Sequence, residues 1–111
     1  MAEDLGKTST GMQPNVAALL SYVAGFITGI IFFVLEKENK FVRFHAMQSI
    51  LISAALFILQ AVLGFIPGVG WVLMPVVSIV GLILWILLMV KAYQGEKFKL
   101  PVVGDIAEKQ A

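Results

Sequence analysis

The chain has 111 residues, of which 59% are hydrophobic and 14% are charged, and its formal net charge is +1. A typical soluble domain has about 45–50% apolar and about 25% charged residues. A soluble chain of this size also exposes most of its residues to water, so the composition argues against a soluble enzyme. The near-neutral charge provides no general attraction to nucleic acid, and the absence of cysteine removes disulfides and thiolate metal sites.

The chain begins with a polar N-terminal tail, residues 1–15, followed by the uncharged segment Val16–Leu35. A helix of 20 residues is about 30 Å long, which matches the hydrocarbon core of a bilayer. A cleavable signal has a basic start and a shorter apolar run, whereas Glu3 and Asp4 precede this one. We therefore expect residues 16–35 to remain in the protein as a transmembrane helix.

A second segment without ionisable groups, Ala46–Val90, contains 45 residues and is too long for one span. Two glycines and a proline within Pro67–Gly70 predict a helix end and a tight reversal there. Division at this point gives helices over residues 46–66 and 71–90. The sequence thus predicts an all-α membrane protein whose domain, residues 16–93, has three transmembrane helices.

The distribution of basic residues predicts the orientation of these helices. The first loop contains Lys37, Lys40 and Arg43, and four more lysines lie from Lys91 onward, whereas the N-terminal tail has only Lys7. With three spans, seven basic residues face one remaining residue across the membrane. The positive-inside rule then predicts a multi-pass cell-membrane protein with its N-terminus outside and its C-terminus in the cytoplasm.

Small residues recur every four positions in the first predicted helix, at Ala17, Ser21, Gly25 and Gly29. Small residues allow helix backbones to approach closely in lipid, and Gly25 and Gly29 form a GxxxG pattern. This helix-packing face has two interpretations. It contacts either a second copy of the chain or, as we favour, the other helices of the same chain.

The densest polar and aromatic cluster precedes the second predicted span, in an interfacial helical segment. Its candidate partner or lipid contacts are Arg43, Phe44, His45 and Gln48. Helical spacing places Phe44, His45 and Gln48 on one face, while Arg43 projects away from it. A ligand or a protein segment could bind there. The favoured alternative is that His45 and Gln48 hydrogen-bond neighbouring helices while Arg43 lies near lipid phosphates.

The sequence provides no catalytic, cofactor-binding or metal-binding set. A single histidine without a nearby acid is a poor basis for catalysis or metal binding. Coupled transporters usually keep an ionisable residue within the membrane, and the predicted spans contain no Asp, Glu, Lys, Arg or His. No cofactor and no small-molecule substrate are therefore expected.

The C-terminal tail, residues 94–111, is too apolar for a plain disordered linker. Gly95 predicts the end of the last span, and the Leu100-Pro101 pair favours extended backbone. We expect this cytoplasmic or interfacial tail to lie on the membrane surface or against the first loop, with partner docking as the alternative.

The segment Glu36-Lys-Glu-Asn-Lys-Phe-Val-Arg-Phe-His-Ala-Met-Gln-Ser49 carries a family resemblance, together with Tyr93-x-Gly95 and Leu100-Pro101-x-x-Gly104-Asp105. These residues resemble a family of small, largely uncharacterised prokaryotic membrane proteins. That family is similar to the Tic-twenty component of chloroplast inner-envelope protein import. The resemblance implies an association with a protein-conducting channel.

Two functions follow as expectations. The first is a non-enzymatic integral membrane protein that acts through self-assembly or partner binding at its cytoplasmic face. The second, implied by the resemblance, is a homo-oligomeric channel or a protein-translocation component, because three helices cannot enclose a pore alone.

Overall fold

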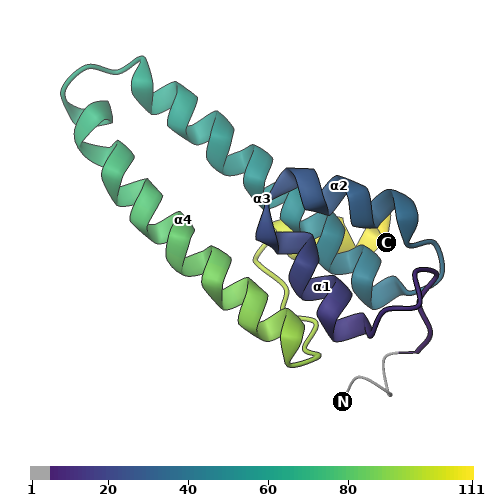
Figure 1. Ribbon diagram of the computed structural model, residues 1–111. Coiled ribbons are helices and arrows are strands. Elements are labelled where there is room, and N and C mark those ends of the chain that lie inside the picture. The colour runs from purple at the N-terminus through teal and green to yellow at the C-terminus, as the bar shows by residue number, and fades with distance from the viewer. Residues whose placement is uncertain (1–5) are drawn as a thin grey trace.

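The computed structural model describes residues 6–111; residues 1–5, the start of the predicted N-terminal tail, lie outside the described part. Five helices follow one another in chain order (Figure 1): α1 Pro14–Val23, α2 Phe26–Leu35, α3 Lys40–Gly64, α4 Val69–Tyr93 and α5 Val103–Gln110. Two of them, α3 and α4, are long and apolar enough to cross a membrane by length and composition.

The first apolar segment forms two helices, so the prediction of one continuous helix over residues 16–35 is wrong. The chain breaks at Gly25, whose φ of 61° lies in the region that favours glycine. The Thr28 hydroxyl stabilises the break, because it accepts the Ala24 amide at 3.1 Å and donates to the Ser21 carbonyl at 3.1 Å. Helices α1 and α2 have ten residues each, about 15 Å or half of the hydrocarbon core.

The two long helices lie close to the predicted second and third spans, residues 46–66 and 71–90. Helix α3 starts earlier than predicted, at Lys40, because the expected interfacial segment continues directly into the span. The Asn39 side chain caps its first turn by accepting the Val42 amide at 3.1 Å. Helix α4 starts at Val69 and includes Pro75 in its interior.

The reversal between α3 and α4 requires glycine at two positions. Gly68 has a φ of 82° and immediately precedes α4. At Gly70, an added Cβ would lie only 2.2 Å from the carbonyl oxygen of Leu63. The predicted turn at residues 67–70 is therefore correct in position, and a close backbone approach explains its second glycine.

Helix α4 ends, as predicted, just before Gly95. The amide of Glu96 donates to the Lys91 carbonyl at 3.0 Å, and the amide of Gly95 donates to the Ala92 carbonyl at 3.1 Å. With a φ of 81° at Gly95, these bonds form a Schellman motif. The chain then runs without helix until α5.

The four helices α1 to α4 are not equally long, and this determines the shape of the protein (Figure 1). Helices α1 and α2 form a short hairpin that packs against one end of the α3–α4 pair. The hairpin, α5 and the C-terminal tail surround that end, and the molecule measures 50 × 22 × 21 Å. Its hydrophobic core lies in this end and is formed by Ala17, Ala18, Tyr22, Phe41, Val42, Leu88, Ala92 and Leu100.

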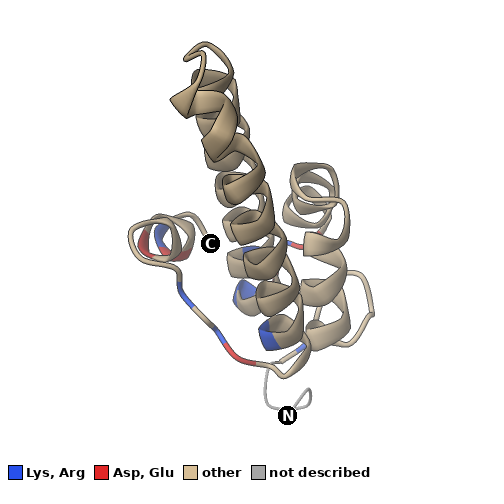
Figure 2. Cartoon of the chain, turned by 90° about the vertical axis from the view of Figure 1, so that its left-hand side faces the viewer, with Lys and Arg blue, Asp and Glu red and all other residues tan. Residues whose placement is uncertain are grey.

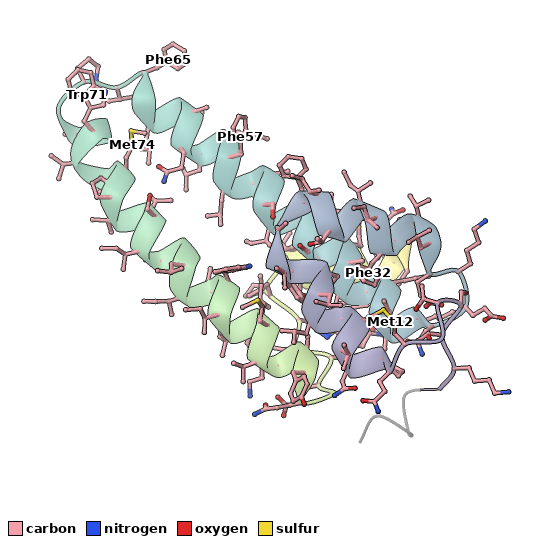
Figure 3. The ribbon with its side chains drawn as sticks, in the orientation of Figure 1. Met12, Phe32, Phe57, Phe65, Trp71 and Met74 are labelled. Atoms are coloured by element: carbon pink, nitrogen blue, oxygen red, sulfur yellow. The ribbon has the colours of Figure 1, made fainter. Side chains whose placement is uncertain are left out.

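The charged residues lie toward the same end of the molecule, as the blue and red segments of Figure 2 show. We call this the charged end; it comprises residues 6–13, the loop 36–39, the adjoining ends of α3 and α4, and residues 94–111. The opposite end, residues 65–70, contains no charged residue. Figure 3 shows Phe65 and Trp71 at this far end.

Candidate functional site

The candidate site is a buried polar cluster at the charged end, formed by Tyr22 of α1 and by His45 and Gln48 of α3. All three side chains are almost fully buried. The segment 95–100 covers them, so that the helix face that was a candidate for partner contact is occupied by the protein's own C-terminal tail.

Both ring nitrogens of His45 have hydrogen-bond partners. Nε2 lies 2.9 Å from the Glu96 carbonyl oxygen, and a carbonyl only accepts, so Nε2 carries the proton. Nδ1 is then the acceptor for the Tyr22 hydroxyl, at 2.7 Å. The ring is therefore a neutral bridge between α1 and the C-terminal tail.

Gln48 completes this cluster with both ends of its amide. Its Nε2 donates to the Tyr22 hydroxyl at 3.0 Å and to the Phe98 carbonyl at 2.9 Å. Its Oε1 accepts the Leu100 amide at 2.9 Å. Two side chains of α3 thus bind the main chain of alternate tail residues, as side chains do when they recognise an extended peptide.

Aromatic rings enclose His45 on three sides. The ring centroids of Phe41, Phe44 and Tyr22 lie 4.7, 5.0 and 5.4 Å from that of His45, all in edge-to-face arrangements. The ammonium group of Lys97 lies 5.2 Å from the centroid of Phe44 and closes the cluster at its outer edge. This packing orients the imidazole and excludes water from it.

The geometry of this cluster suits a structural role better than a chemical one. A general base needs a free nitrogen directed at a substrate, whereas both His45 nitrogens are occupied. Within residues 6–111, no group of three or more His, Asp or Glu side chains could hold a metal ion. The cluster attaches the tail to the helices.

Arg43 projects away from this cluster, as predicted, and binds the end of α2. Its Nη1 donates to the carbonyls of Phe33 at 2.9 Å and Glu36 at 2.7 Å. Its Nε donates to the main-chain oxygen of Ala111 at 3.2 Å, and the guanidinium lies 4.1 Å from the Phe33 ring centroid. A cation at the carboxyl end of a helix satisfies the last carbonyls and complements the helix dipole.

Glu36 attaches the N-terminal tail, as the polar cluster attaches the C-terminal tail. It was not among the predicted site residues. Its buried carboxylate accepts the Ser9 amide at 2.9 and 2.7 Å, and the amides of Glu38 and Asn39 at 3.1 and 3.0 Å. Burial raises the pKa of Glu36, but these hydrogen bonds outweigh burial and hold it below its usual value. The sequence feature that could have indicated this role is an acid directly after an apolar segment.

The predicted helix-packing face is divided between α1, the hairpin turn and α2. Ala17 and Ser21 are fully buried in α1, which packs against α3 and α4. A Cβ on Gly29 would lie 3.0 Å from the Ala46 carbonyl oxygen of α3. Gly25 forms the turn itself, so these small residues contact helices of the same chain.

Comparison with known proteins supports the membrane location. A UPF0132 membrane protein of Methanocaldococcus jannaschii is 55% identical over 105 residues, covering 95% of this chain and 94% of the relative. A UPF0132 membrane protein of Archaeoglobus fulgidus is 54% identical over 99 residues, covering 89% and 96%. A second M. jannaschii protein of that name is 44% identical over 99 residues, covering 89% and 71%.

These relatives do not bear the name of a chloroplast import component, so that part of the expected resemblance gains no support from them. No solved structure matches the chain. The model of the magnetosome magnetite crystal formation protein family matches residues 8–107. This range includes the Tyr22–His45–Gln48 cluster, Glu36 and the whole α1–α2 hairpin. The chain therefore belongs to this family of small membrane proteins.

Proposed function

We propose that the protein is a non-enzymatic membrane component that acts by binding a partner, or a second copy of itself, at its charged end. One observation carries this proposal. Hydrogen bonds hold both tails against the helices at the charged end, which forms a surface we call the platform, whereas the far end is a short apolar turn. Exposed Lys37, Glu38 and Lys40 lie on this platform, beside the anchored tail. A partner can recognise a surface of this kind by charge and shape.

The proposal includes a revised orientation, with both termini on the cytoplasmic side. The hairpin α1–α2 returns to the end at which it starts, since Ser9 binds Glu36 and Asn15 Nδ2 donates to the Tyr93 carbonyl at 3.0 Å. All eight basic residues then lie on one side. This distribution satisfies the positive-inside rule better than the three-span prediction did.

Site-specific photo-crosslinking in cells tests the binding proposal. A photoreactive residue at Lys37 or Lys40 should give a discrete adduct, whose partner is identified by mass spectrometry and reproduced with purified components. The same probe at Phe65, on the far end, is the matched control. Equal adducts from Phe65, or none from either lysine, would contradict the proposal.

A channel or translocation component is the second candidate, and the broken helix favours it. Irregular backbone at membrane depth occurs where it is buried in protein or lines a cavity. A cavity of about 180 Å³ lies beside the hairpin turn, lined among others by Tyr22, Ser49 and Trp85. A single chain encloses no pore there, so this function requires an oligomer; unchanged ion and dye flux in vesicles containing the protein would exclude it.

The family's description, magnetite crystal formation, suggests a mineral-related role, and the far end of this chain does not favour one. Iron and other hard cations bind carboxylate oxygens. Residues 65–70 provide no carboxylate. The described acidic residues of this chain lie at the charged end, so a mineral-binding role at the far end would need a partner that carries the acidic groups.

A further inference from the structure

The number of helices in cross-section differs between the two halves of the molecule. The hairpin α1–α2 ends about midway along α3, where a Cβ on Gly25 would lie 3.0 Å from the Ser53 hydroxyl. On the other side, the Trp85 indole of α4 donates to the Tyr22 carbonyl near the end of α1. Four helices therefore surround the charged half.

The far half consists only of the outer parts of α3 and α4. In α3 all buried residues lie between Phe41 and Ser49, except Leu63 near the turn. Phe57 is 75% exposed and Phe65 is 88% exposed, and both point away from the helix pair in Figure 3. The large exposed side chains of this half are apolar, as expected for a surface that faces lipid.

The charged end is broadened further by α5, which packs along α3 and lies to one side of the long helices in Figure 2. Its buried residues, Gly104 and Ala107, face the protein, while the apolar Val102 and Ile106 are exposed. An exposed apolar side chain beside charged groups suits the interface between headgroups and acyl chains.

We propose that the protein is a membrane wedge, which favours bilayers whose surface is convex on the side of the charged end. A helix is about 10 Å across, so two additional helices add about 160 Å² of cross-section to one leaflet. The opposite leaflet receives only the α3–α4 pair. Curvature toward the narrow half relieves this mismatch, as deformation of the bilayer does for other mismatched shapes. This inference rests on the membrane location and on the hairpin topology included in the proposed function, and it does not depend on partner binding.

Vesicles of mixed size test the wedge with the complete chain. The protein has no cysteine, so Asp105→Cys places a single fluorophore on α5, where the side chain is 73% exposed. An impermeant quencher then separates molecules whose charged end faces outward from those in the opposite orientation. The outward fraction should rise about twofold or more from vesicles of about 400 nm to those of about 50 nm.

The matched control carries the fluorophore at the narrow end, through Pro67→Cys. Its outward fraction should fall as the vesicles become smaller, because the label now reports the other orientation. The two labelled variants are measured in vesicles of the same sizes, and each fraction is a ratio within one variant. Unequal labelling of the two cysteines therefore cannot produce opposite trends. Fractions that do not depend on diameter would overturn the wedge, including the case in which a second copy fills the space beside the far half. Loss of cross-linking from Lys37 would leave this result unaffected.

Discussion

Glu36 determines how the N-terminal tail is attached, and its low pKa gives this attachment a pH dependence. A carboxyl group whose pKa is lower in the folded state stabilises that state above its unfolded pKa. This contribution is lost as the pH falls through the folded pKa, which lies below the usual value of 4.5. A fluorophore at Thr10→Cys should therefore lose anisotropy as the pH falls below the usual titration range of a glutamate carboxyl.

Two variants distinguish Glu36 from general acid effects. Glu36→Gln removes the charge that the Ser9 amide binds, so the anisotropy at pH 7 should already be low and should not change on acidification. Glu38→Gln alters an exposed acid whose carboxylate contacts Ser9 only through a 3.4 Å hydrogen bond from the Ser9 hydroxyl, and it leaves the main-chain contact between the two residues in place. It should retain the transition of the parent protein; loss of the transition in this variant would contradict the assignment.

Gln48 is the residue on which attachment of the C-terminal tail depends most. Gln48→Leu keeps the size of the side chain but leaves the Leu100 amide and the Phe98 carbonyl without their partner. Buried polar groups without partners cost about 1–3 kcal/mol each, so the variant should lose about 3 kcal/mol of stability. Unfolding in mixed micelles measures the loss, and trypsin should cleave faster after Lys97 and Lys99.

Met47 provides the comparison for Gln48, because it is the preceding residue of α3 and half-buried. Met47→Leu is a volume-conserving exchange that should cost less than about 1.5 kcal/mol. Its cleavage rate at the tail should equal that of the parent protein. Equal cleavage of Gln48→Leu and Met47→Leu would show that the amide does not hold the tail.

Val102 occupies an unfavourable conformation at the start of α5. Its φ of 66° and ψ of −58°, with a 2.7 Å hydrogen bond from the Val103 amide to the Pro101 carbonyl, form a strained γ-turn. Val102→Gly removes the strain and should raise stability by about 1 kcal/mol, after the greater chain entropy of glycine is deducted. Val103→Gly, at an ordinary helical position, should give no gain in the same thermal unfolding measurement.

At the scale of elements, the α3–α4 turn provides a pair of glycines with opposite expectations. Gly70→Ala places a methyl group 2.2 Å from the Leu63 carbonyl, so the helix ends must separate and stability should fall by about 1–3 kcal/mol. Gly64→Ala meets only the Met74 methyl at 4.0 Å and should be neutral or stabilising by up to about 1 kcal/mol. Thermal unfolding of both variants in the same detergent compares them directly.

The sequence predicted the long elements well because their signals are local. Charge-free segments and the glycines at 68, 70 and 95 determine α3 and α4 to within a few residues, apart from the early start of α3. The break at Gly25 was missed because hydropathy is the same for one straight helix and for a hairpin. The sequence feature that could have predicted the break is Thr28, a small polar residue three positions after Gly25 in the middle of an apolar segment.

The polar cluster was predictable only in part. The face shared by Phe44, His45 and Gln48 follows from helical spacing, which is a property of one element. Their partners do not, because Tyr22 precedes His45 by 23 positions and the tail follows it by about 50. Contacts over such separations depend on the packing of whole elements, which the periodicity of a single helix does not describe.

At the scale of the whole molecule, the proposed orientation makes a prediction opposite to that of three spans. Single cysteines at Thr10, Glu38 and Asp105 should all be protected from an impermeant thiol reagent added to intact cells. Pro67→Cys should be labelled from outside, since it lies in the turn at the far end. Labelling of Thr10→Cys from outside would restore the three-span topology and reject the hairpin.

The uncharged far end also bears on how the chain enters a membrane. In the proposed orientation, only the turn at residues 65–68 and the apolar halves of two helices pass through the hydrocarbon core. No lysine, arginine or carboxylate has to be carried across, and transfer of such groups is the step that is most expensive in free energy. Insertion can then proceed as a helical hairpin pushed in from one side, with no need to export either terminus.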